Sequence, residues 1–260
     1  MSFSTTTVRA VAVPGLLLLL ALAIALSLLI GAKPLPPSVI VDAFSGSCQS
    51  ADCTIVLDAR LPRTLAGLLA GCALGLAGAL MQTLTRNPLA DPGLLGVNSG
   101  ASFAIVLGAA LLGITSPQEQ LLMAFCGAFA ASLLVAFTGS QGGGQLSPVR
   151  LTLAGVALAA VLEGLSNGIA LLNPDVYDQL RFWQAGSLDI RTLQTLKIVL
   201  LPVLIAAVVT LFLSRALNSL CLGADTATAL GSRVARTQLI GLLAITVLCG
   251  SATALVGPIA

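Results

Sequence analysis

The sequence has 260 residues, of which 57% are hydrophobic and only 8% charged, with a mean hydropathy of +1.03. Soluble proteins carry roughly 25% charged residues, so this composition cannot build a water-facing surface. The small formal charge of +2 is spread along the chain and argues against nucleic-acid binding. Without histidine or a Cys-x-x-Cys pair, we expect no metal site, no cofactor and no catalytic triad, so the chain is not predicted to be an enzyme.

Seven apolar runs of roughly membrane-spanning length follow one another along the chain. The first, residues 11–31, exceeds the roughly 7 to 15 apolar residues of a cleavable signal and leads into a proline-rich stretch instead of a cleavage site. The others are residues 64–84, 94–113, 121–138, 151–172, 193–213 and 238–256. Short connectors with Pro and Gly join them. The sequence therefore predicts an all-α, polytopic membrane protein of about seven transmembrane helices, forming one transmembrane domain over residues 1–260.

The cysteines fall into two kinds of environment. Cys72, Cys126 and Cys249 lie within apolar runs, where a thiol packs as a small hydrophobe. Cys48 and Cys53 instead flank a polar stretch in the first long loop. They could close a short disulfide if this loop faces an oxidising compartment; the alternative is two unpaired thiols.

Small residues recur at intervals of four in several spans. Such stripes allow helix backbones to approach closely in lipid, where no hydrophobic force drives helices together. They are Gly67, Gly71 and Gly75, then Gly155 and Ala159, and then Gly164 and Gly168. We expect the second and fifth spans to be central to the bundle.

Charged residues leave the orientation open. With the N-terminus inside, the twelve basic residues divide equally between the two sides of the membrane. Arg60 and Arg63 lie three residues apart at the start of the second span and so share one face at the outer mouth. They could be interfacial side chains, with Asp58 pairing Arg60, or they could steer the docking of a partner protein.

Glu163 is the only acidic residue well inside a predicted span. It continues the spacing of Gly155 and Ala159, so we expect it to face the bundle, in a hydrogen-bonded packing role or lining a wet cavity. A proton relay is the alternative, and it would make the chain a proton-coupled secondary transporter. We favour the first interpretation because no titratable partner lies in the neighbouring spans.

Three polar connectors have distinct characters. Residues 86–93 hold two prolines and a glycine, which predicts a rigid turn. Residues 139–145 are glycine-rich but lack the lysine of a Walker sequence, so any ATPase must be another chain. Residues 222–233 are too short and polar to span, and they predict a small helix that a glycine terminates.

Two long motifs carry a family resemblance. One runs from Arg60-Leu-Pro-Arg63 through Arg86-Asn-Pro-Leu-Ala-Asp-Pro-Gly93 to Asn98-Ser-Gly100, and the other joins residues 153–158 to Phe182-Trp-Gln-Ala-Gly-Ser-Leu188. Together they resemble the FecCD family of ABC-importer permeases over essentially the whole chain. The family fold has about ten spans, so the resemblance implies that a C-terminal part is missing here.

The resemblance also implies a function and partners. It implies a bacterial inner-membrane subunit that passes a ferric siderophore, within this family ferric enterobactin, inward from a periplasmic binding protein. The expected partners are that binding protein, a second and different permease subunit, ATP-binding subunits and membrane lipid, but no nucleic acid. Arg60 and Arg63 would dock the binding protein. Asn87, Leu89, Ser147 and Pro148 would form a cytoplasmic gate, and the ATPase would couple through Gly223, Asp225, Ala229, Leu230 and Gly231.

Overall fold

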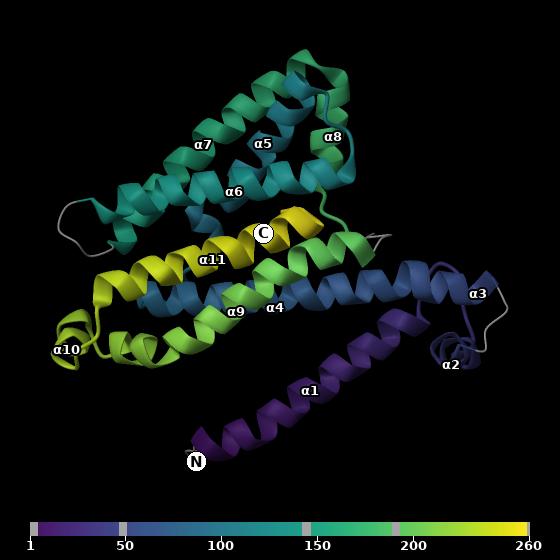
Figure 1. Cartoon of the computed structure of the whole chain (residues 1–260), viewed down its shortest axis with the longest axis horizontal. Coiled ribbons are helices and arrows are strands. Elements are labelled where there is room, and N and C mark those ends of the chain that lie inside the picture. Colours follow the sequence, from purple (N-terminus) through teal and green to yellow (C-terminus); the bar gives the residue numbers. More distant parts are fainter. Residues whose placement is uncertain (1–4, 47–50, 142–146, 189–192, 259–260) are drawn as a thin grey trace. The chain divides into compact units, whose positions relative to one another are not determined.

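The computed structural model describes residues 5–46, 51–141, 147–188 and 193–258, in which every regular element is helical (Figure 1). In chain order these are α1 (Thr5–Leu29), α2 (Pro37–Ser45), α3 (Ala51–Thr54), the π-helical stretch η1 (Ile55–Arg60), α4 (Leu61–Thr85), the 3-10 turn η2 (Pro92–Leu95), α5 (Val97–Leu112), α6 (Pro117–Ser140), α7 (Pro148–Leu172), α8 (Pro174–Gln184), α9 (Leu193–Cys221), α10 (Ala224–Ala229) and α11 (Val234–Val256). The predicted all-α class is confirmed. The chain packs as two compact units, residues 1–67 with 188–193 and residues 68–187 with 194–260.

Within the described residues, six helical stretches are long and apolar enough to cross a membrane: Ala12–Leu29, Ala51–Thr85, Pro117–Ser140, Pro148–Leu172, Leu193–Cys221 and Val234–Val256. They correspond to six of the seven predicted spans. The seventh, predicted at residues 94–113, is the 16-residue helix α5. At 1.5 Å per residue its length is about 24 Å, short of the roughly 30 Å hydrocarbon core. The difference arises at Gly96, whose φ of 70° separates η2 from α5, so Leu94 and Leu95 belong to a turn.

The first unit is built around the end of α1. From Ala51 the chain is helical through α3 and η1 into α4. Leu35, Ala43, Cys53 and Val56 form a small buried core beneath α2. The hydroxyl groups of Ser27 and Thr64 lie 2.7 Å apart and join α1 to the beginning of α4.

In the second unit, α5 packs against α6, α7, α8 and α11. Glycines of α5 and α6 approach each other closely: a Cβ added to Gly100 would lie 2.5 Å from Gly127 O, and it would also overlap Ala131 Cβ. On the other side of α6, a Cβ added to Gly250 of α11 would lie 3.4 Å from Ala128 Cβ. Backbones this close are typical of small-residue packing in membranes.

The predicted packing stripes hold in part. Gly155 of α7 is buried against Leu94, as expected for a packing position. Gly71, Gly75, Gly164 and Gly168 are exposed, and an added Cβ at any of them would meet no atom within 4 Å. The buried side of α4 is instead an adjacent alanine stripe, Ala66, Ala70, Ala73 and Ala77. The prediction was wrong for Gly71 and Gly75 because two neighbouring faces of α4 are both lined with small residues, whereas a Cβ added to Gly67 would lie 3.7 Å from a Leu188 methyl group.

Candidate functional site

The two outer arginines lie in different environments. Arg63 is exposed at the start of α4, as a docking residue requires. Arg60 is only 7% exposed, and its guanidinium donates to the backbone carbonyls of Leu28, Leu29 and Lys33 at 2.7, 2.8 and 2.5 Å. The last carbonyls of a helix have no partner within the helix, and a cation at this end is favoured by the helix dipole. Arg60 therefore caps the C-terminus of α1.

Gly31 makes room for this cap. A Cβ at residue 31 would lie 2.8 Å from Arg60 Nη2 and 3.0 Å from Arg60 Cζ. Neither the burial of Arg60 nor its backbone acceptors were predicted from the sequence. The sequence offered a local pairing of Arg60 with Asp58 as an alternative. In the described part of the chain, the hydrogen bonds of the Arg60 guanidinium go to these carbonyls instead.

The sequence left open whether Cys48 and Cys53 bond to each other or remain unpaired thiols. Cys53 is buried in the core of the first unit and is disulfide-bonded. Cys48, the partner that the sequence offers for such a bond, lies outside the described residues. The remaining cysteines, Cys72, Cys126, Cys221 and Cys249, are free thiols.

The first predicted gate segment is a rigid turn, as the sequence indicated. Arg86 has a φ of 51°, and Asn87 N donates to Gln82 O at 3.1 Å, which closes the end of α4 as a Schellman motif does. The Asn87 side chain then accepts from Leu89 N at 3.0 Å. Leu89 itself is 87% exposed. This turn presents a large apolar side chain on a backbone fixed by its own hydrogen bonds.

The turn continues into η2, which enters the bundle. Asp91 caps η2 by accepting from Gly93 N at 2.6 Å. Leu94 O packs directly on the backbone of Gly155, and a Cβ added to Gly96 would lie 3.7 Å from a Leu158 methyl group. The first predicted gate segment is therefore connected through η2 to α7.

The second predicted gate segment begins α7. Ser147 accepts from Arg150 N at 3.5 Å and Pro148 occupies the first helical turn, a standard start for a helix. The end of α6 lies close by, because a Cβ added to Gly139 would come within 2.7 Å of Leu151 Cγ. Both predicted gate segments thus start from stiff, capped helix ends. That they open and close together stays a prediction.

The predicted coupling segment is the short helix α10 with a glycine on each side. Gly223 has a φ of 114° and Gly231 a φ of 82°. Asp225, Ala229, Leu230 and Gly231 are all exposed, and Leu230 is 64% exposed. A Cβ added to Gly223 would lie 3.8 Å from Arg86 Nη1. The α10 segment therefore adjoins the last turn of α4 and the first predicted gate segment.

Glu163 does not face the bundle as predicted, since it is exposed on α7 beside Gly164 and Asn167. The reason is helix geometry. At 3.6 residues per turn, eight residues rotate the side chain by about 80° from Gly155, enough to leave the buried face. Among the described residues, no group of three or more His, Cys, Asp or Glu could hold a metal ion.

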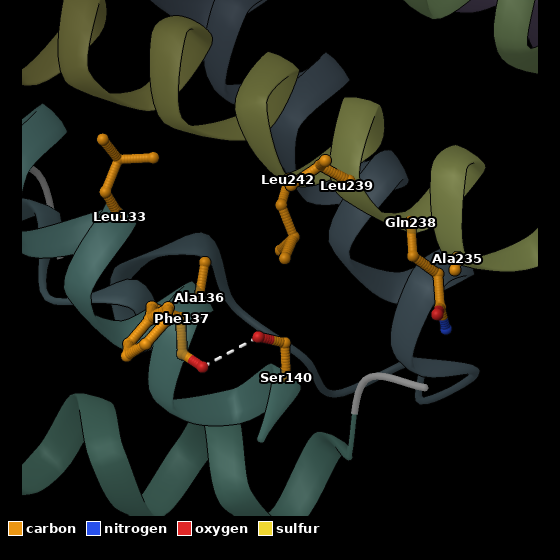
Figure 2. A pocket seen from close by; sticks show the side chains of 8 residues that line it. All are labelled: Leu133, Ala136, Phe137, Ser140, Ala235, Gln238, Leu239 and Leu242. Atoms are coloured by element: carbon orange, nitrogen blue, oxygen red, sulfur yellow. Dashed lines mark hydrogen bonds between the residues drawn. The ribbon is translucent and has the colours of Figure 1, made fainter. Parts of the chain in front are cut away.

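A groove of about 490 Å³ runs between α6 and α11 (Figure 2). Figure 2 shows Leu133, Ala136, Phe137 and Ser140 of α6 facing Ala235, Gln238, Leu239 and Leu242 of α11. Ser140 donates to Phe137 O at 2.8 Å. The groove lies at the end of the bundle where α6 finishes and α11 begins, and its lining carries no charge.

A polar contact that the sequence did not reveal joins α5 to α11. Thr253 Oγ1 donates to Asn98 Oδ1 at 3.0 Å, across 155 positions of sequence. The signal available was a polar residue within each of two apolar runs, but their pairing depends on the tertiary fold.

Apolar helices long enough to span a bilayer, joined by short capped turns, define the chain as a multi-pass membrane protein. A model of the FecCD transport family matches residues 18–260. The chain belongs to the FecCD transport family.

Individual relatives place the chain more closely. It is 85% identical over all 260 residues to the ferric enterobactin transport system permease protein FepD of Escherichia coli (strain K12), and spans 78% of that protein. It is 35% identical over 235 residues to the permease protein FepG, also of Escherichia coli (strain K12), covering 88% of this chain and 69% of FepG.

A solved structure has the same fold. It is a metal-chelate type ABC transporter in an inward-facing conformation, with a TM-score of 0.79 and 27% identity over 95% of this chain and 76% of the other. The chain is therefore a multi-pass protein of the inner membrane, and its relatives are transport permease subunits.

Proposed function

We propose that this chain is the membrane-spanning subunit of an ABC importer that carries ferric enterobactin inward from a periplasmic binding protein. The observation that carries the proposal is the 85% identity over the whole chain to a permease whose name states that cargo. An uncharged groove such as that between α6 and α11 suits a bulky chelate better than a bare metal ion, which needs charged or polar ligands.

The proposed partners follow from the same relatives. Two different permease proteins of Escherichia coli, FepD and FepG, are named for ferric enterobactin transport, which supports a heterodimer of permease subunits. ATP would be hydrolysed by separate subunits, since the glycine-rich segment of this chain lacks the Walker lysine. The permease itself would catalyse no covalent step.

We propose that α10 receives the movement of the ATPase. Its exposed residues Asp225, Ala229 and Leu230 would contact that partner. Because Gly223 adjoins Arg86, a displacement of α10 would press on the turn that holds Asn87 and Leu89. η2 would carry it onward to α7, which Ser147 and Pro148 begin. On the outer side, Arg63 would steer the binding protein into register, as exposed charges at the rim of an interface do.

The cargo can be tested by complementation. In cells that lack their own ferric enterobactin permease, this protein should restore uptake of radioactive iron supplied as ferric enterobactin. The control uses cells that also lack their hydroxamate permease and supplies the iron as a ferric hydroxamate. This iron should not enter. Restoration of hydroxamate uptake without enterobactin uptake would contradict the proposed cargo.

A further inference from the structure

Helix α2 has three different sides. Val39 and Ala43, four residues apart, face the buried core of the first unit. A second side is polar and exposed, with Ser38, Asp42 and Ser45. The third side is apolar and also exposed, with Pro37, Val41 and Phe44.

The exposed apolar side is a continuous ridge. Pro37, Val41 and Phe44 are spaced four and three residues apart, which aligns them along one face of a helix. Val41 is 67% exposed and Phe44 is 55% exposed. At about 100° per residue this ridge lies between the core-facing side and the polar side. A nine-residue helix therefore offers separate surfaces to protein, to an apolar medium and to water.

The structure fixes α2 at the end of a membrane span. The Arg60 guanidinium holds Lys33 O, and Lys33 forms an ion pair with Asp52, so the link from α1 to α2 is anchored on both sides. Figure 1 shows α2 almost end-on next to the C-terminal end of α1, which lies across the view. The axis of α2 is thus transverse to a helix that crosses the membrane.

Exposed apolar side chains also lie at the neighbouring end of α1. At the same end of α1, Leu26 is 43% exposed and Ile30 is 69% exposed. Leu26 belongs to the candidate membrane span Ala12–Leu29, and Ile30 directly follows the last residue of that span. No charged side chain interrupts the ridge of α2, whereas Arg63, the residue proposed for protein docking, is charged.

We propose that α2 is an interfacial helix that lays Pro37, Val41 and Phe44 into the outer leaflet of the bilayer. Ser38, Asp42 and Ser45 then face water. Amphipathic helices of this kind bury their apolar face roughly 5–10 Å into the boundary between headgroups and acyl chains. The assignment to the outer leaflet rests on the orientation in the proposed function, with the binding protein on the side of Arg63.

Tryptophan fluorescence tests the proposal in the full-length protein reconstituted into proteoliposomes. Phe44→Trp places a reporter on the apolar ridge, and Ser38→Trp places a matched reporter on the polar side. The native protein, with its single Trp183, supplies the background signal to subtract. Each protein is measured in vesicles whose phosphatidylcholine has brominated acyl chains, and separately with iodide in the buffer.

Brominated lipid should quench the fluorescence that Phe44→Trp adds to the Trp183 background, and iodide should not. For Ser38→Trp, iodide should quench the added fluorescence and brominated lipid should not. Iodide quenching of both reporters, with no effect of brominated lipid, would overturn the proposal. A second result would also overturn the proposal: Phe44→Trp fluorescence that is protected from iodide only after binding protein is added. The ridge would then be a surface that contacts protein. Iron uptake measured with each variant separates this result from the proposed function: active transport without lipid quenching rejects the interfacial helix alone.

Discussion

Replacing Gly155 with alanine should remove most of the folded protein from the membrane. The added Cβ would overlap Leu94 O and lie 2.8 Å from Leu94 C, and both are backbone atoms. Overpacking a well-packed site typically costs roughly 1–3 kcal/mol, and a backbone neighbour cannot turn aside as a side chain can. The measurement is the amount of monodisperse protein after detergent extraction, together with its thermal unfolding midpoint.

The same helix provides matched controls for Gly155. Gly164 and Gly168 also lie on α7, and an added Cβ at either meets nothing within 4 Å. Gly164→Ala and Gly168→Ala should leave yield and unfolding midpoint unchanged or slightly raised, since alanine favours a helix over glycine by roughly 1 kcal/mol. Equal behaviour of Gly155→Ala and Gly164→Ala would show that η2 does not pack on α7.

Replacing Arg60 with glutamine should destabilise the protein, whereas Arg63→Gln should leave its stability unchanged. Arg60→Gln removes the charged donor from three carbonyls at the end of α1, and a buried polar group without a partner costs roughly 1–3 kcal/mol. Arg63 is exposed, so its loss should affect only the docking of the binding protein and the salt dependence of that docking. Thermal unfolding in detergent measures the first effect, and binding of the iron-loaded binding protein to proteoliposomes measures the second.

A third variant isolates the contribution of the guanidinium. Arg60→Lys keeps the positive charge beside the end of α1 but cannot present two nitrogens to separate carbonyls. It should recover only part of the lost stability. If Arg60→Gln were as stable as the native protein and bound the binding protein more weakly, then Arg60 would be a docking residue and not a cap.

Local chemistry in the sequence is sufficient to predict the turns. The Asn87 and Asp91 side chains bond to backbone amides two residues ahead, and Ser147 accepts from an amide three residues ahead. A proline directly follows each of these three residues, and its ring restricts the backbone at that next position. These contacts need no distant partner, so residues 86–93 and 147–148 fold as their sequence indicates.

Features that depend on distant contacts could not be predicted in the same way. The acceptors of Arg60 lie 27 to 32 positions away, and no local pattern identifies them. The apolar run at residues 94–113 concealed the boundary at Gly96, because Leu94 and Leu95 are as hydrophobic as the helix that follows. The four-residue spacing from Gly155 and Ala159 placed Glu163 on the buried face. Four residues turn a helix by slightly more than one full turn, so each step of four moves the side chain further around the helix.

The source of energy for uptake tests the central claim most directly. Spheroplasts bypass the outer membrane, so ferric enterobactin and binding protein can be supplied to the permease itself. Uptake of radioactive iron should stop when the partner ATPase carries a hydrolysis-inactivating substitution. It should persist when an uncoupler collapses the proton gradient while cellular ATP is maintained, and Glu163→Gln should transport as the native protein does. Uptake that survives the inactive ATPase but fails with the uncoupler and with Glu163→Gln would contradict the assignment and identify a proton-coupled transporter.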